Sequence, residues 1–280
     1  SAALRRPLVR RALRPAMQLL AQVYFKDQKV ELARLVLENA RTLDQNDAGT
    51  HNALGLVYLA LKQRPQAQES FRQATLLKPD FAEARNNFGA MLNDAQDYEA
   101  SVKELEAAVA AAPGFLMAHL NLGNAYRGLQ QVDRALAEYQ RVLAARPEVP
   151  DTYFNLGVTY LDQEVPGKEP EERFKTAIAY FTQYREKGGK DDRVEQYLKD
   201  ATKAIEKEQR RKEREKKDQL RKVEQAKKDA EDQKRKVIEK VTDALVEALG
   251  APKENVRVWL TEVPKTQWGI AGKTAKDLGR

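Results

Sequence analysis

Apolar, small and polar positions recur along this chain with a period of 34 residues. Within each half-period the apolar residues lie three and four positions apart, which predicts two amphipathic helices per period. An apolar residue followed by glycine marks the first helix, at Leu54–Gly55, Phe88–Gly89, Leu122–Gly123 and Leu156–Gly157. A small residue and then a bulky one mark the second helix, at Ala67 and Phe71, Ser101 and Leu105, and Ala135 and Tyr139. Small residues let two helices approach closely and bulky ones fill the remaining space.

The same register extends to both sides of these repeats. Ala21 stands where the glycine would be one period before Gly55. After Gly157 the small and bulky pair comes late, at Ala177 and Phe181, so we expect a lengthened loop between the two helices. The predicted units span residues 14–47, 48–81, 82–115, 116–149 and 150–191.

The glycines and their companions resemble the tetratricopeptide repeat (TPR) family over residues 14–205. The resemblance implies an α-solenoid, whose helix–turn–helix units bury their apolar faces by stacking on one another. A helical run that contains Val194, Tyr197 and Ala201 is expected to cap the last unit. The predicted fold class is mainly α: a TPR α-solenoid of about five units plus a capping helix, a long charged helix and a small α/β C-terminal segment.

In the TPR family the first helices line a concave groove that binds an extended or helical peptide. By the family's register, the positions two before the glycines face this groove, and they hold Asn87, Asn121 and Asn155. Amides both donate and accept, so this row suits a peptide backbone. Further residues expected on the same surface are Asn86, Asn93, Asp94, Asn124 and Arg127. The alternative is that these asparagines stabilise the fold or are simply solvated.

The net charge of +7 is concentrated outside the repeats. Five arginines and no acid occupy residues 1–14, and residues 203–236 hold fifteen Lys or Arg against nine Asp or Glu. Opposite charges recur four positions apart in the second stretch, which is typical of a solvated helix. We therefore expect a basic N-terminal segment at 1–13 and a capping and charged linker helix at 192–236. The alternative is a nucleic-acid tether through these segments, whose binding would weaken steeply with salt. No aromatic residues are interleaved with the charges, so no nucleic acid is expected.

The composition gives little support for a disulfide-bonded, membrane-spanning or metal-binding protein. The chain has no cysteine, and no apolar stretch approaches the ~18 residues of a membrane span. His51 and His119 occupy the fourth position of two units that are two repeats apart, so we expect packing rather than a metal site. No metal and no cofactor are predicted.

The pattern changes from Val237 onward. A short amphipathic helix is expected to end at Gly250 and Pro252. Residues 255–263 alternate with period two and predict a strand, and residues 268–272 predict a turn or hairpin.

This last stretch resembles the 4-oxalocrotonate tautomerase family. The resemblance lies in Gln233-Lys234, in residues 248–252, in Val256-Arg257-Val258, and in residues 261–265 and 268–272. It implies a β-α-β unit whose subunits assemble through their sheets, so residues 237–280 are expected to form a homo-oligomer. Catalysis in the family needs an N-terminal proline as the base, and that place falls on Gln219 within the charged helix. One substrate-binding arginine of the family falls on Asp229, whereas Arg257 and Trp268 match the other arginine and the aromatic wall.

The sequence therefore predicts no catalytic residues and no enzyme activity. We expect a non-enzymatic TPR scaffold that binds a protein or peptide in its groove, with a tautomerase-like module used for assembly. The alternative from another class is a tautomerase or isomerase that its TPR array localises. Without its first strand, the module either borrows one from another chain or is a poorly ordered appendage. The abrupt join between the repeats, the charged helix and the tautomerase-like segment is compatible with a natural or an engineered fusion. The type of TPR array is compatible with a bacterial protein of the cell envelope, periplasm or cytoplasm.

Overall fold

The computed structural model describes residues 2–250, 252–258, 269–270 and 273–274, with side chains from residue 13 onward up to 258. The chain divides into two units, residues 1–208 and 209–280. The first unit contains α1 (Ala2–Lys26), α2 (Val30–Leu43), α3 (Ala48–Ala60), α4 (Arg64–Leu77), α5 (Ala82–Asp94), α6 (Tyr98–Ala111), α7 (Leu116–Gly128), α8 (Val132–Ala145), α9 (Pro150–Asp162) and α10 (Pro170–Glu186). The long helix α11 (Arg193–Leu249) begins in the first unit and ends in the second.

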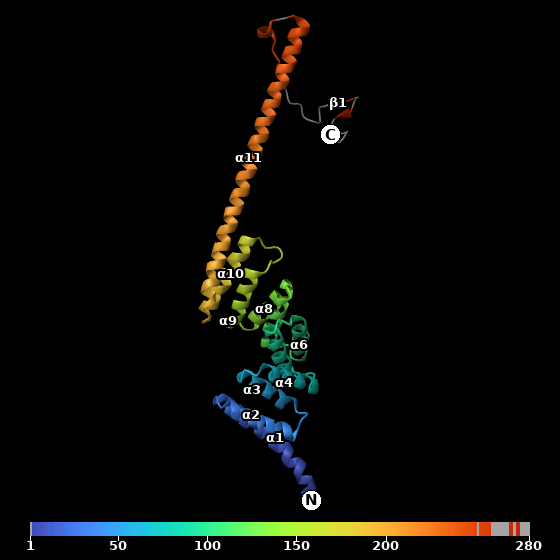
Figure 1. The fold of residues 1–280 in the computed structure, drawn as a ribbon, viewed down its shortest axis with the longest axis vertical. Helices are drawn as coiled ribbons and strands as arrows, with labels where there is room; N and C mark the ends of the chain where they lie inside the picture. Colours follow the sequence, from blue (N-terminus) through green and yellow to red (C-terminus); the bar gives the residue numbers. More distant parts are fainter. Residues whose placement is uncertain (1, 251, 259–268, 271–272, 275–280) are drawn as a thin grey trace. The chain divides into compact units, whose positions relative to one another are not determined.

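Consecutive helices pair into hairpins, from α1 with α2 to α9 with α10, and Figure 1 shows the hairpins stacked in chain order. The basic segment 1–13 is not separate, because α1 runs through it without a break. Each of the first four hairpins turns through a short loop whose middle residue has a left-handed backbone, with φ between 59° and 62°. These middle residues are Gln28, Lys62, Gln96 and Gln130.

The repeated glycines are the points where the two helices of a hairpin meet most closely. A Cβ on Gly89 would lie 2.5 Å from Cγ of Leu105, and one on Gly123 would lie 2.5 Å from the Tyr139 ring. Gly55 and Gly157 meet Phe71 and Phe181 in the same way. The pairing of each glycine with the bulky residue of its partner helix is therefore confirmed, including the late pair in the last hairpin.

In the second to fifth units, the side chain at position four hydrogen-bonds to the loop that precedes the unit. The ring Nε2 of His119 lies 2.9 Å from the Pro113 carbonyl, and its Nδ1 lies 2.5 Å from a Glu138 carboxylate oxygen. Corresponding bonds to the carbonyl six residues earlier are made by His51 to Gln45, Arg85 to Pro79 and Tyr153 to Pro147. Both histidines are buried, so their expected role in packing is confirmed.

Two apolar clusters make up the core of the first unit. One extends from Ala21 to Met91 and the other from Leu105 to Val194. Val194 of α11 is fully buried in the second cluster, against which Tyr197 packs, and Ala201, one turn beyond Tyr197 along α11, is also fully buried. Tyr197 stacks on Phe181 with ring centroids 5.4 Å apart. The predicted capping run is thus confirmed.

The loop 163–169 replaces the short turn of the other hairpins, as the late small–bulky pair predicted. Arg173 stabilises it from α10. Its guanidinium donates to the carbonyls of Tyr160, Leu161 and Gln163, at 2.7–3.0 Å. These carbonyls belong to the C-terminal turn of α9, where the helix leaves its last acceptors unpaired.

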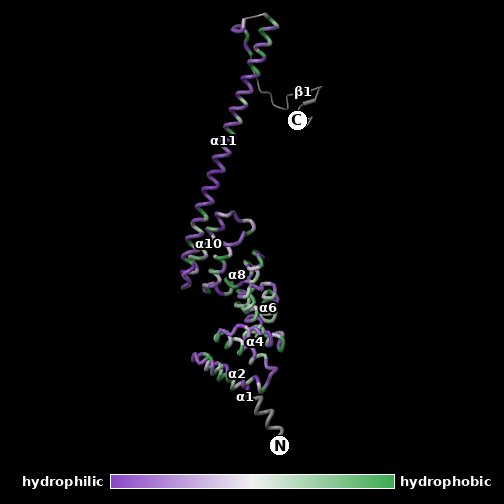
Figure 2. Tube along the Cα trace, in the orientation of Figure 1, coloured by the Kyte–Doolittle hydropathy of each residue, from purple (hydrophilic) through white to green (hydrophobic). Residues whose placement is uncertain are grey.

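In the second unit, α11 is strongly hydrophilic until its last turns, as its colouring in Figure 2 shows. Residues 220–226, which take the place of the tautomerase family's first strand, are helical, and Leu220 and Val223 are more than half exposed. Near its end α11 exposes an apolar face made of Val237, Val241, Leu245 and Leu249. A separate helix from Val237 was expected, but α11 continues through that point because no helix-breaking residue occurs there.

The predicted end of this helix is confirmed, since Gly250 adopts φ 60° directly after Leu249. The strand expected at 255–263 is not present in its described part. Asn255 instead closes the 3-10 helix η1 (Lys253–Asn255), and no strand follows over 256–258. The hairpin expected at 268–272 corresponds to β1 (Gly269–Ile270) and β2 (Lys273–Thr274), which pair antiparallel with Ile270 opposite Lys273.

Candidate functional site

The first helices of neighbouring hairpins are joined by a chain of amide hydrogen bonds. Asn121 Nδ2 donates to Asn86 Oδ1 at 2.9 Å, and Asn87 Nδ2 donates to Asn52 Oδ1 at 3.0 Å. A longer bond of 3.4 Å from Asn86 to Asn87 connects the two pairs. The four amides therefore form one network across α3, α5 and α7. Each still has capacity left, because an amide offers two donor hydrogens and an acceptor with two lone pairs.

Asn93 and Arg127 lie further along the same helices, in partly buried positions. Asn93 Nδ2 donates to the backbone carbonyl of Asn121 at 2.9 Å, whereas its Oδ1 is buried without a hydrogen bond. The Nε of Arg127 is also buried without a hydrogen-bond partner. Buried polar atoms without partners cost free energy, so this part of the first helices keeps one unsatisfied acceptor and one unsatisfied donor.

The remaining two predicted groove residues differ in their surroundings. Asn124 Oδ1 accepts a hydrogen bond from the hydroxyl of Tyr139 at 2.8 Å, so this amide also serves the packing within its hairpin. Burial raises the pKa of Tyr139 to about 12, which keeps that hydroxyl protonated. Asn155 is partly buried, and its backbone carbonyl accepts from Thr159 at 2.7 Å. Of the expected groove amides, Asn86, Asn87 and Asn121 are thus hydrogen-bonded to one another or to Asn52. Asn124 is instead hydrogen-bonded to Tyr139 of the core.

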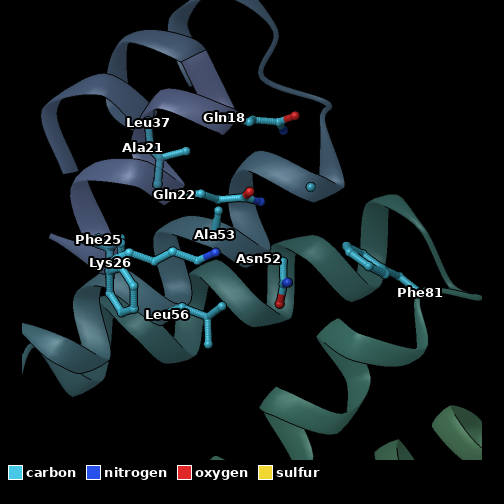
Figure 3. A pocket seen from close by; sticks show the side chains of 12 residues that line it. Gln18, Ala21, Gln22, Phe25, Lys26, Leu37, Asn52, Ala53, Leu56 and Phe81 are labelled. Carbon is cyan, nitrogen blue, oxygen red and sulfur yellow. The ribbon is translucent and has the colours of Figure 1, made fainter. Parts of the chain in front are cut away.

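A pocket with a cavity volume of about 340 Å³ lies at the N-terminal end of this surface, between α1 and α3. Its floor is apolar and nearly fully buried, formed by Ala21, Leu37 and Val57. Figure 3 shows Gln18, Gln22 and Lys26 of α1 around the pocket, opposite Asn52, Ala53 and Leu56 of α3. The remaining lining residues are Phe25, Gly49 and Phe81.

Polar bonds hold α1 in place beside this pocket. Gln18 Nε2 donates to Asp47 Oδ2 at 2.6 Å and to the Thr50 hydroxyl at 3.0 Å. Asp47 is also the N-cap of α3, since it accepts from the Thr50 backbone amide at 2.8 Å. Arg14 adds ion pairs to Asp44 and Asp47. The pocket wall is therefore anchored at one end by a cap that the local sequence determines.

The pocket residues Gln18, Gln22, Lys26 and Leu56 were not among the predicted site residues. For Gln18 the signal was the register itself, because subtracting 34 from Asn86 gives Asn52 and subtracting 34 again gives Gln18. The prediction started at the third unit, where the asparagines are most obvious. It therefore left out the polar positions of the first unit.

The tautomerase-like residues are not brought together in the described part of the chain. Arg257 is exposed, and Trp268 lies outside the described residues. Gln219 and Asp229, on which the base and one substrate-binding arginine of the family were expected to fall, both lie within α11. Among the described residues there is no group of three His, Cys, Asp or Glu side chains arranged to hold a metal ion. None of the described helices has the length and apolar character to cross a membrane.

Family models match both parts of the chain. Tetratricopeptide repeat models match residues 52–114 and 123–164, and a tautomerase enzyme model matches residues 220–278. The last segment is similar to the 2-hydroxymuconate tautomerases of Comamonas testosteroni and Pseudomonas putida, each 70% identical over 40 residues. Those residues are 14% of this chain, and the chain spans 64% of the length of these relatives.

The repeats are similar to several solved structures. PilF of Pseudomonas aeruginosa is 22% identical with a TM-score of 0.59, over 70% of this chain and 86% of that one. PilW, a type IV pilus biogenesis factor, is 26% identical with a TM-score of 0.58, over 70% and 90% of the two chains. YrrB, a TPR protein with an unusual peptide-binding site, is 19% identical with a TM-score of 0.52, over 65% and 90%.

Proposed function

We propose that this chain, which carries tetratricopeptide repeats followed by a tautomerase-like segment, is a scaffold that binds a protein segment along the first helices of its repeats. The carrying observation is the amide network across α3, α5 and α7, whose first member, Asn52, also lines the pocket between α1 and α3. Hydrogen-bonding groups at regular intervals suit a polypeptide backbone, which presents a donor and an acceptor at nearly every residue. The similarity to PilW favours a role in bacterial cell-envelope assembly within this proposal.

The experiment is the selection of dodecamer peptides from a random display library on the full chain. The affinity of a selected peptide is then measured on Asn87→Ala and Asn121→Ala, well below the melting temperature of each variant. Removing a hydrogen bond at an interface costs about 1–2 kcal/mol, so we expect a five- to thirtyfold weaker Kd. The matched control is Asn39→Ala, on an exposed position of α2. Equal affinities for all three variants would place the binding site elsewhere and refute the proposal.

Within this proposal the tautomerase-like segment serves assembly rather than catalysis. The apolar face of α11 formed by Val237, Val241, Leu245 and Leu249 is exposed, each side chain by 37% or more. A second copy of the same face is the occupant we assign, because the related tautomerase family is expected to assemble from identical subunits. Light scattering on the full chain and on a chain that ends at Thr202 tests this role. We expect a defined multimer for the first and a monomer for the second, and two monomers would refute it.

A further inference from the structure

The pocket between α1 and α3 has an apolar floor, and the charge on its rim is positive. Leu56 is 41% exposed at the pocket, so an apolar contact surface is available there. Gln18, Gln22 and Asn52 are neutral amides, and Lys26 is the charged side chain among the residues that line the cavity. No aspartate or glutamate is part of this lining.

Lys26 is exposed and has no ion-pair partner among the residues whose side chains the structure describes. The neighbouring acids are engaged elsewhere: Asp27 lies 3.6 Å from Lys29, and Asp47 is paired with Arg14. The pocket therefore keeps an unneutralised positive charge beside its apolar floor. An incoming carboxylate would meet attraction there and no competing acid.

The cavity volume of about 340 Å³ lies at the lower end of the range of ligand clefts, roughly 300–1,000 Å³. It is large enough for one bulky side chain together with part of a neighbouring residue. The amide network begins at its edge, since Asn52 both lines the pocket and accepts from Asn87. A chain bound here thus continues along the helices rather than ending in the pocket, which favours a side-chain carboxylate over a C-terminal one.

We propose that the pocket between α1 and α3 binds an apolar side chain of the bound segment and that Lys26 selects an adjacent glutamate or aspartate. The inference rests on the proposed function and adds the chemistry of the partner to it. The apolar floor contributes affinity through burial. The lysine contributes selectivity through the sign of its charge.

The test uses three blocked peptides of equal length in an alanine–serine background, with a central Leu-Glu, Leu-Lys or Ser-Glu pair. Binding to the full chain is followed by NMR, through the methyl signals of Ala53 and Leu56. Lys26 attracts the glutamate of one peptide and repels the lysine of the other, and each effect is modest because the charge is exposed to solvent. We therefore expect the Leu-Glu peptide to bind about five to ten times more tightly than Leu-Lys, and Ser-Glu to bind more weakly than Leu-Glu.

Lys26→Glu provides the decisive variant, because the exposed residue near the end of α1 can change without affecting the core. We expect it to reverse the preference, so that Leu-Lys binds more tightly than Leu-Glu. Lys103→Glu is the matched control, an exposed lysine on α6 outside the pocket, and should keep the original preference.

Equal binding of Leu-Glu and Leu-Lys, or an unchanged preference in Lys26→Glu, would overturn the inference. If the peptides instead shift the signals of Asn87 and Asn121 without any charge preference, the inference fails while the proposed groove function stands. If no peptide shifts any signal while library selection on the full chain yields binders, the pocket assignment alone is refuted.

Discussion

Replacing Gly89 by alanine adds a single methyl group at the closest approach between α5 and α6. The new Cβ would lie 2.5 Å from Leu105 Cγ and 2.9 Å from Leu105 Cδ2. Ordinary carbon–carbon contacts lie at about 3.5–4.0 Å, so the two groups must separate by about 1 Å. Leu105 is fully buried, and protein interiors are close-packed, so its neighbours oppose such a movement. The strain of such overpacking is typically about 1–3 kcal/mol.

Alanine also has a higher helix propensity than glycine, by about 1 kcal/mol. We therefore expect Gly89→Ala to lower the free energy of unfolding by up to about 2 kcal/mol in the natural background. In a Leu105→Ala background the obstacle is absent, although that substitution alone costs about 2–5 kcal/mol. There Gly89→Ala should raise the free energy of unfolding by about 1 kcal/mol, so the effect changes sign.

The assay is urea unfolding of the full chain followed by far-UV circular dichroism, for both single variants and the double variant. The matched control is Gly114→Ala, where an added Cβ would meet nothing within 4 Å, and we expect a change within about 0.5 kcal/mol. The same sign in both backgrounds would refute the reasoning, because the glycine would then not be required by its contact with Leu105.

Three further predictions concern the turns, the core and the C-terminal segment. Gln96→Gly should stabilise the chain by about 0.5–1 kcal/mol in thermal melts, because glycine adopts the left-handed φ of 62° at this position without the steric cost that a Cβ brings. The control Gln73→Gly, inside α4, should destabilise the chain instead. The pKa of Tyr139 is raised to about 12 from 10.0, so between these pH values the unfolded state loses a proton that the folded state keeps. Tyr139 should therefore contribute a fall in the free energy of unfolding of up to about 1.4 kcal/mol per pH unit there, and urea titrations of Tyr139→Phe should show a correspondingly smaller fall. Finally, the full chain should not turn over a 2-hydroxydienoate, because the expected place of the catalytic base falls on Gln219. Turnover that Arg257→Ala abolishes would contradict this prediction and favour an enzyme.

Much of the repeat fold could be predicted because its determinants are periodic in the chain. Gly123 and Tyr139 are 16 residues apart in the sequence and meet in the structure because a hairpin of two helices brings them together. The capping role of Val194 followed in the same way from helical spacing and apolar character. The C-terminal prediction was less successful, since the alternation of residues 255–258 did not produce a strand. Strands need a pairing partner, and α11 occupies the stretch that would have supplied one.

The candidate site was predicted in part. The sequence identified polar positions on the first helices, but it could not show that Asn121 bonds to Asn86 and Asn87 to Asn52. These bonds join residues 35 positions apart and depend on how one hairpin is rotated against the next.

The sequence by itself determined the hairpins, their register, their closest contacts and the cap, because each depends on residues within one or two neighbouring units. The tertiary structure alone decided where polar groups are satisfied and where space is left. Lys26 and Leu56 line one pocket only because α1 and α3 lie side by side with Gln18 bonded to Asp47. The volume between two helices is set by their packing geometry and by every side chain at the interface, and no local pattern in the chain specifies it.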